Sequence, residues 1–153
     1  MSRSNVALSD ALHEGLYGIG EAARLSGVSA KMIRYYESID LLPETRRTAA
    51  NYRLYALSDI HQLQFIKRAR SLGFSVKQII RLVGLWQNRE RCSADVKELA
   101  LSHVQEIDQR IKEMREMRNA LSKLAEQCQG DNQPQCPILE SLANEGLYDS
   151  TIL

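Results

Sequence analysis

The sequence has no apolar run that approaches the roughly 18 residues needed to cross a bilayer. Its first 15 residues also lack the continuous apolar stretch of a secretory signal. We therefore expect no membrane segment and a cytoplasmic location. Disulfides are disfavoured there, so the three cysteines are expected to act as thiols or metal ligands. Three cysteines are also too few for an iron–sulfur site with four thiolate ligands.

Motifs of catalysis are missing as well. The sequence contains no phosphate-binding loop, no dinucleotide fingerprint and no nucleophile placed beside a base. The three histidines, His13, His61 and His103, are far apart and share no spacing typical of metal ligands. We therefore predict that the protein is not an enzyme.

The net charge of +1 hides an uneven distribution of charge. Residues 15–86 contain 11 lysines and arginines against 5 acidic residues, whereas residues 87–153 contain 8 against 12. A basic half joined to an acidic half is typical of a polyanion-binding module that carries a second module. The overall composition, with 44% hydrophobic and 25% charged residues, is that of an ordinary globular protein.

The basic half begins with two predicted short helices. Apolar residues at helical spacing predict a helix over residues 19–26, which Gly27 ends. Ser29 is a good N-cap for a second helix over residues 30–39. Three side chains that can reach bases or phosphates share its outward face: Lys31, Arg34 and Tyr35. Two short helices joined by a tight turn indicate a helix-turn-helix, whose second helix enters the major groove of DNA.

Residues 40–55 break the helical period, because Pro43 opposes continuation of a helix. The segment RRTAANYRLY predicts a small hairpin, in which Asn51 takes a left-handed turn conformation. A hairpin beside a helix-turn-helix is a wing. This one carries cations and phenols that can contact the phosphate backbone: Arg46, Arg47, Tyr52 and Arg53.

Two more helices complete the basic half. We expect Ser58 to cap a helix over residues 59–72 and the capping box that starts at Ser75 to open another. Trp86, near the end of that helix, is interpreted as a packing residue.

A long helix is predicted over residues 93–127, which contain no glycine or proline. At 1.5 Å per residue it is roughly 50 Å long. Its apolar stripe is too long for the preceding small domain to bury, so we expect two chains to pair through it as a homodimer. The stripe consists of Val104, Ile107, Ile111, Met114, Met117, Leu121 and Leu124.

The run from YGIGEAARLSGVSAKMIRYYE to the wing NYRLY resembles the DNA-binding domain of the MerR family. The resemblance continues through FIKRARSLGFSVKQIIRLV and covers about residues 17–137. It implies a mainly α protein with a winged helix-turn-helix domain over residues 17–86, a long antiparallel dimerisation helix and a C-terminal metal-binding loop. It also assigns Lys31, Arg34 and Tyr35 to the recognition helix, and Arg47, Tyr52 and Arg53 to the wing. The family often has glycine where this sequence has Asn51.

Cys128 and Cys136 are separated by seven residues and followed by Pro137. This arrangement is similar to the sensor loop of the copper-efflux-regulator (CueR-like) branch of the family. Two thiolates on one short loop favour soft monovalent ions in linear coordination, namely Cu(I), and with it Ag(I) or Au(I). A buried Cu(I) dithiolate carries a net charge of −1. We expect the start of a partner's long helix near Ser93, with Lys97 one turn in, to compensate that charge.

By the same resemblance, relatives that respond to divalent ions have cysteine at the start of the dimerisation helix, and the copper branch has serine. Ser93 takes that position here. Cys92 precedes it by one residue, which turns its side chain away by roughly 100°. A sensor of divalent Zn, Cd, Hg or Pb remains an alternative. So do a dithiol redox switch and an effector-free architectural DNA-bending protein, whereas the basic winged half argues against a metal buffer.

The resemblance implies a homodimeric regulator that binds double-stranded promoter DNA with and without metal. The metal-bound form is expected to bend and undertwist the DNA, so that RNA polymerase can use a promoter of efflux or detoxification genes. The remaining segments are expected to be a flexible leader (residues 1–16), the metal-binding loop with a short helix (residues 128–146) and a loose tail (residues 147–153).

Overall fold

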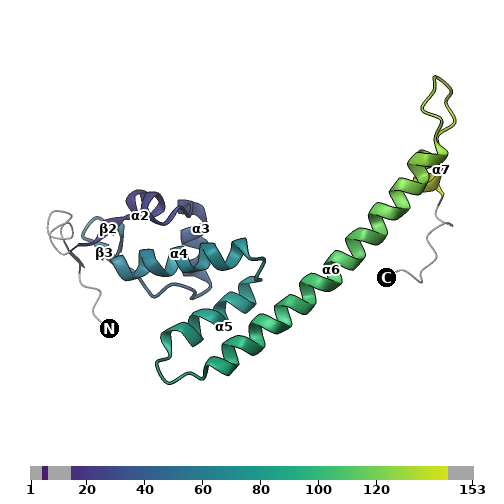
Figure 1. Ribbon diagram of the computed structural model, residues 1–153. Coiled ribbons are helices and arrows are strands. Elements are labelled where there is room, and N and C mark those ends of the chain that lie inside the picture. Colours follow the sequence, from purple (N-terminus) through teal and green to yellow (C-terminus); the bar gives the residue numbers. More distant parts are fainter. Residues whose placement is uncertain (1–4, 7–14, 145–153) are drawn as a thin grey trace. The chain divides into compact units, whose positions relative to one another are not determined.

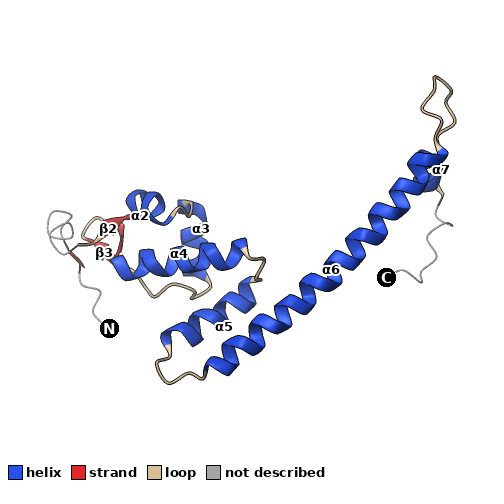
Figure 2. Cartoon of the chain, viewed as in Figure 1, coloured by secondary structure: helices blue, strands red, loops and turns tan. Residues whose placement is uncertain are grey.

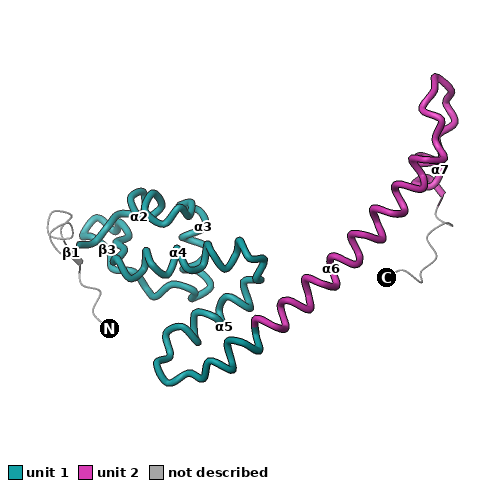
Figure 3. Tube along the Cα trace, viewed as in Figure 1, with its two compact units in different colours: residues 1–99 teal, residues 100–153 magenta. Residues whose placement is uncertain are grey.

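The structure is a computed structural model that describes residues 5–6 and 15–144. The fold is mainly helical, as predicted (Figures 1 and 2). Its elements are β1 (Asn5–Val6), β2 (Tyr17–Gly18), α2 (Ile19–Ser26), α3 (Ala30–Ser38), β3 (Arg46–Thr48), β4 (Arg53–Tyr55), α4 (Leu57–Ser71), α5 (Val76–Gln87), α6 (Ser93–Gln127) and α7 (Pro137–Ala143). The chain divides into two compact units, residues 1–99 and residues 100–153 (Figure 3). Among the described residues, no helix combines the length and apolar character needed to cross a bilayer.

Helices α2 and α3 form the predicted helix-turn-helix. Gly27 ends α2 with a φ of 70°, a left-handed conformation that glycine adopts without strain. Ser29 caps α3 by accepting a hydrogen bond from the Met32 N–H at 3.3 Å. Both capping predictions are confirmed. Ile33 and Tyr36 on the inner face of α3 are buried, which turns the opposite face of the helix outward.

Four short strands form one sheet in the order β1-β3-β4-β2. Strands β3 and β4 are the antiparallel pair of the predicted wing, and Asn51 in their turn has the expected left-handed φ of 66°. Strand β2 pairs antiparallel with β4, which fixes the wing to the start of α2. The two wing strands therefore have a neighbour on each side, β1 beside β3 and β2 beside β4, and the wing continues into α4 through β4.

Strand β1 differs from the flexible leader predicted over residues 1–16. Residues 5–6 pair in parallel with β3, and Asn5 lies opposite Arg47. The pairing joins segments about 40 residues apart, and a two-residue strand leaves no period in the sequence to reveal it. Three other parts of the predicted outline lie outside the described residues, namely 1–4 and 7–14 of the leader, 145–146 at the end of the short helix, and the tail 147–153.

The core of the first unit lies among α2, α3, α4, α5 and the sheet. Trp86 of α5 stacks on Phe65 of α4, with ring centroids 4.6 Å apart and planes within 3°. This contact confirms the packing role predicted for Trp86. The large side chains that are almost fully buried come from α3, β4, α4 and α5: Ile33, Leu54, Tyr55, Ile60, Leu63, Ile66 and Ile79.

Helix α4 begins at Leu57, two residues before its predicted start. The prediction that Ser58 caps this helix is wrong. Ala56 is the N-cap residue, and the Asp59 carboxylate accepts a hydrogen bond from the Ala56 N–H at 2.7 Å. Burial raises the pKa of the Asp59 carboxyl, against the opposing effect of this hydrogen bond. Helix α5 starts as predicted, at the capping box that begins with Ser75.

Helix α6 is continuous from Ser93 to Gln127, the range predicted from the sequence. In the single chain its apolar stripe is largely exposed, with Met114 66% and Leu121 56% exposed. The loop after α6 leads into α7, whose first residue is Pro137, a position where proline's missing N–H costs no hydrogen bond.

Candidate DNA-binding face and metal-binding loop

The three side chains predicted to read DNA lie together on α3. Lys31, Arg34 and Tyr35 are all exposed, and Tyr35 is 43% exposed although it carries a large ring. Tyr35 contacts its buried neighbour Tyr36, with ring centroids 5.8 Å apart. The structure therefore presents two cations and one phenol on the outer face of the second helix of a helix-turn-helix, where a major-groove contact is made.

The wing presents the other predicted contacts. Tyr52 is 69% exposed beside the hairpin turn. Arg47 is partly buried, and its Nη1 donates to the backbone oxygen of Asn51 at 3.2 Å and to the Asn51 Oδ1 at 3.3 Å. The left-handed residue of the turn thus also anchors an arginine. An anchored guanidinium loses less side-chain entropy when it binds a phosphate.

Arg53 is held from the recognition helix. Its Nε lies 2.8 Å from Oε2 of Glu37, an ion pair whose geometry falls short of an aligned hydrogen bond. The same carboxylate accepts hydrogen bonds from the Thr45 Oγ1 at 2.7 Å and from the Tyr55 hydroxyl at 3.3 Å. Burial and the neighbouring Glu37 raise the pKa of Tyr55, so the phenol stays protonated and remains a donor.

Sequence reasoning missed Glu37 as a functional candidate. It stands inside the IRYYE motif, but its three partners follow it by 8 to 18 positions. Glutamate at the end of a helix is ordinarily exposed, and nothing in the local pattern indicates a buried carboxylate. Only the closing of the wing against α3 brings the four residues together.

The two cysteines predicted to bind metal flank one loop of the second unit. Cys128 directly follows α6, and Cys136 is the residue before α7. Both thiols are free and partly buried. Gly130, at a φ of 65°, turns the loop, and the Cys136 carbonyl accepts the Glu140 N–H at 3.0 Å. Thiolates are ligands that soft ions such as Cu(I) prefer.

The two residues predicted to compensate the metal charge lie at the other end of α6. Ser93 is its first residue, and Lys97 is one turn further on; both are exposed. Cys92 precedes them and is also exposed. A helix of 35 residues separates its ends by roughly 50 Å. Contact between Ser93 and the cysteine loop would therefore need a second chain.

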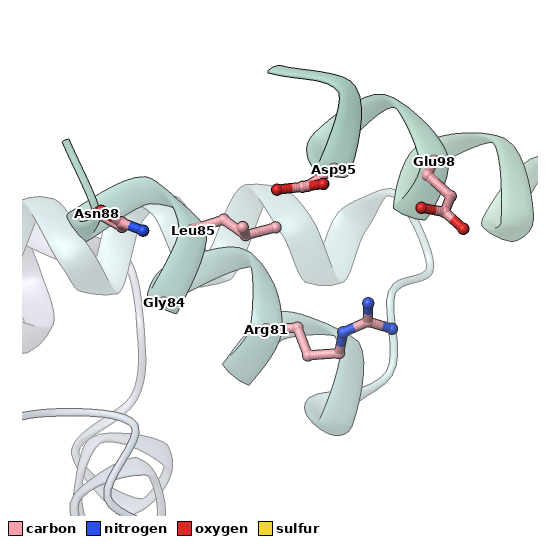
Figure 4. Close-up of a pocket in the computed structure, with 6 residues that line it drawn as sticks. All are labelled: Arg81, Gly84, Leu85, Asn88, Asp95 and Glu98. Carbon is pink, nitrogen blue, oxygen red and sulfur yellow. The ribbon is translucent and has the colours of Figure 1, made fainter. Parts of the chain in front are cut away.

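A groove of about 470 Å³ lies between α5 and the first turns of α6 (Figure 4). It is lined by Arg81, Gly84 and Leu85 of α5, by Asn88 just after that helix, and by Asp95 and Glu98 of α6. Charges of both signs and one apolar side chain give it no preference for a single class of ligand. None of the predicted site residues lines this groove.

Recognition helix, wing and sheet together define a winged helix-turn-helix DNA-binding protein. The chain matches the model described as "MerR family regulatory protein" over residues 18–55 and the model described as "MerR, DNA binding" over residues 60–124. The chain belongs to the MerR family of transcriptional regulators, as the resemblance predicted. This membership also confirms that the protein is not an enzyme.

Curated relatives agree with this membership. The chain is 52% identical over 128 residues to the HTH-type transcriptional regulator HmrR of Sinorhizobium medicae, covering 84% of this chain and 87% of the relative. It is 52% identical over 126 residues to the heavy metal-dependent transcription regulator 2 of Rhizobium meliloti, covering 82% and 86%. It is 38% identical over 125 residues to the HTH-type transcriptional regulator CueR of Escherichia coli O6:H1, covering 82% and 93%.

Solved structures are similar at comparable coverage. The regulator PbrR691 from Ralstonia metallidurans in complex with lead(II) matches with a TM-score of 0.72 and 31% identity, over 81% of this chain and 97% of that chain. MerR from Bacillus megaterium in complex with the mercury(II) ion matches with a TM-score of 0.63 and 31% identity, over 84% and 100%. This chain is thus a transcriptional regulator of a family that includes heavy metal-dependent members.

Proposed function

We propose that the protein is a homodimeric, metal-responsive transcription regulator that senses Cu(I), and also Ag(I) or Au(I), through Cys128 and Cys136. The observation that carries this proposal is the loop of the second unit, which holds two free, partly buried thiols. Among the described residues, no group of three or more His, Cys, Asp and Glu side chains gathers to hold an ion. A two-thiolate donor set suits a monovalent soft ion better than a divalent ion that takes four ligands.

The proposed dimer would bury the apolar stripe of α6 and bring a second helix start to the cysteine loop. The exposed stripe of α6 costs free energy in water and is long enough to pair with a second copy. An antiparallel pairing lays the start of one α6 near the end of the other. Ser93 and Lys97 of the partner then approach the cysteine loop. There the positive end of the helix dipole and one ammonium offset the charge of a Cu(I) dithiolate.

The proposed mechanism works through a two-state protein. Lys31, Arg34 and Tyr35 contact the major groove, and Arg47, Tyr52 and Arg53 contact the adjacent backbone, in two half-sites of double-stranded promoter DNA. The thiolates bind the ion, which supplies a charge and a crosslink that favour one arrangement of the dimer. That arrangement bends and undertwists the promoter for RNA polymerase, which activates efflux or detoxification genes. The cytoplasm keeps the thiols reduced.

A divalent-ion sensor of the same family is the second candidate. Two observations favour it: similar proteins bind lead(II) and mercury(II), and Cys92 is exposed beside Ser93. An effector-free architectural protein is disfavoured, because it has no use for a two-cysteine loop.

Metal titration of the reduced protein with X-ray absorption separates the candidates. The proposal expects one Cu(I) per loop with two sulfur neighbours. Three or four sulfur neighbours, or tighter binding of Zn(II) than of Cu(I), would support the divalent sensor. A protein that binds neither ion but still bends DNA would support the architectural alternative.

A further inference from the structure

One carboxylate connects the recognition helix to the wing. Glu37 lies in the last turn of α3 and contacts three residues of the wing region. Thr45, just before β3, donates to one carboxylate oxygen; Arg53 and Tyr55 of β4 approach the other. By contrast, the contact of Arg47 with Asn51 stays within the hairpin.

The environment of Glu37 makes this connection stronger than a surface ion pair. Its side chain is only 13% exposed, and that of Arg53 is 33% exposed. Partial burial reduces screening by water and salt. The buried hydroxyl of Tyr55 completes the shell around the carboxylate and cannot itself touch DNA, since Tyr55 has no exposed surface.

The ion pair uses only one edge of the Arg53 guanidinium. Its Nε faces Glu37, while four of the five N–H donors of a guanidinium belong to the two terminal nitrogens. No other hydrogen bond or ion pair of the Arg53 side chain occurs among the described residues. The guanidinium is thus held through its Nε, and the N–H groups of its two terminal nitrogens remain available. This arrangement suits a hydrogen-bonded contact with a phosphate at a fixed position.

We infer that Glu37 is a positioning residue for DNA binding. It fixes the wing at one distance from the recognition helix and aims the Arg53 guanidinium at the phosphate backbone, while α3 contacts the adjacent bases. The inference rests on the proposed DNA contacts of α3 and the wing, and it adds an acidic residue to a surface that binds a polyanion.

Because Glu37 is acidic, simple electrostatics and the positioning role predict opposite changes in DNA affinity when it is removed. Removing a carboxylate from a DNA-binding face strengthens binding by simple electrostatics. If Glu37 positions Arg53, its removal weakens binding instead. The probe is a DNA duplex that the native dimer selects from a randomised pool, and binding is measured over a series of salt concentrations.

For Glu37→Gln we expect about tenfold weaker binding, and a salt dependence reduced by about one phosphate contact. Arg53→Ala should show the same two changes, and the double variant should be no weaker than Arg53→Ala alone. Asp40→Asn is the matched control. It removes an exposed carboxylate just after α3 and keeps a residue type that tolerates the φ of 58° found there, so binding should stay equal or become tighter.

Equal or tighter binding by Glu37→Gln, or losses that add in the double variant, would overturn the inference. If Glu37→Gln does not fold, Tyr55→Phe decides: weaker binding by the folded variant supports the role, and unchanged binding overturns it. The Arg53 Nε–H signal in the NMR spectrum of the free protein is a readout without DNA. It should shift in Glu37→Gln, and an unshifted signal contradicts the ion pair itself. A native dimer that selects no duplex contradicts the proposed function, whatever this signal does.

Discussion

At the scale of single residues, the side chains proposed to contact DNA differ in how firmly they are held. Arg47 is anchored to Asn51, and Arg53 to Glu37. The side chains of Lys31 and Arg34 make no hydrogen bond or ion pair within the described part of the chain. Contacts to phosphates mainly position a protein on DNA, whereas the second helix of a helix-turn-helix reads base edges in the major groove. Base reading is therefore expected from α3.

Arg34→Ala tests that assignment. Loss of a guanidinium that contacts a base should weaken operator binding by about 1–3 kcal/mol in both the metal-free and the metal-bound protein. Affinity for the metal should not change, because Arg34 belongs to the first unit and the cysteine loop to the second. Gel-shift titrations measure the first quantity and copper titrations the second. Lys112→Ala, which removes an exposed cation from α6, is the control. Normal operator affinity of Arg34→Ala would contradict the assignment.

At the scale of elements, the sequence predicts those features whose cause is local. Ser29 and Ser75 bond to residues three positions ahead, so their caps can be recognised in a short window. The prediction for Ser58 failed because α4 begins at Leu57, which places Ser58 inside the helix, and the carboxylate of Asp59 makes the capping contact with the Ala56 N–H. Strand β1 and the Glu37 contacts were missed because their partners are distant in sequence.

The wing turn depends on one residue in a left-handed conformation. Asn51 tolerates its φ of 66°, whereas alanine there is strained by about 1–2 kcal/mol. Asn51→Ala also removes the Asn51 Oδ1 acceptor of Arg47. We expect a lower unfolding temperature and weaker DNA binding, measured by calorimetry and by gel shift. Asn51→Gly relieves the strain but not the lost acceptor, so it should recover stability more fully than binding. Equal stability of the two variants would mean that the turn is not strained.

At the scale of the whole molecule, the predicted metal site is only half contained in one chain. The cysteine loop and the bounds of α6 follow from local spacing, and the structure places them where the sequence does. The predicted roles of Ser93 and Lys97 concern the cysteine loop of a second chain, and the position of a second chain does not follow from the local sequence. The exposed stripe of α6 is the feature on which the proposed dimer rests, because an antiparallel pairing through it would bring the start of a second α6 near the cysteine loop.

Leu121→Glu tests the pairing. Leu121 is 56% exposed in the single chain, and in the proposed dimer the new carboxylate would be buried without a partner. We expect monomers in sedimentation experiments and loss of tight operator binding, since one half-site supplies only part of the contacts. Lys123→Glu places the same side chain off the stripe and should leave the dimer intact. A dimeric Leu121→Glu protein would show that this residue faces water in the assembly.

Ser93→Cys probes the proximity of one chain's helix start to the other chain's cysteine loop. If the two lie together in the dimer, a third thiolate lets the site hold a divalent ion with three or more ligands. Ser93→Cys should therefore gain activation by Zn(II), Cd(II) or Hg(II), read with one reporter promoter across a panel of ions. Cys92→Ser is the matched variant and should keep its response to copper, because Cys92 precedes the first residue of α6 and one step along a helix start is expected to turn a side chain by roughly 100°. Loss of copper activation in Cys92→Ser would make Cys92 a ligand and rule out the two-coordinate site. Equal activation of the native protein by Zn(II) and copper would contradict the prediction that Ser93 makes the site selective for monovalent ions.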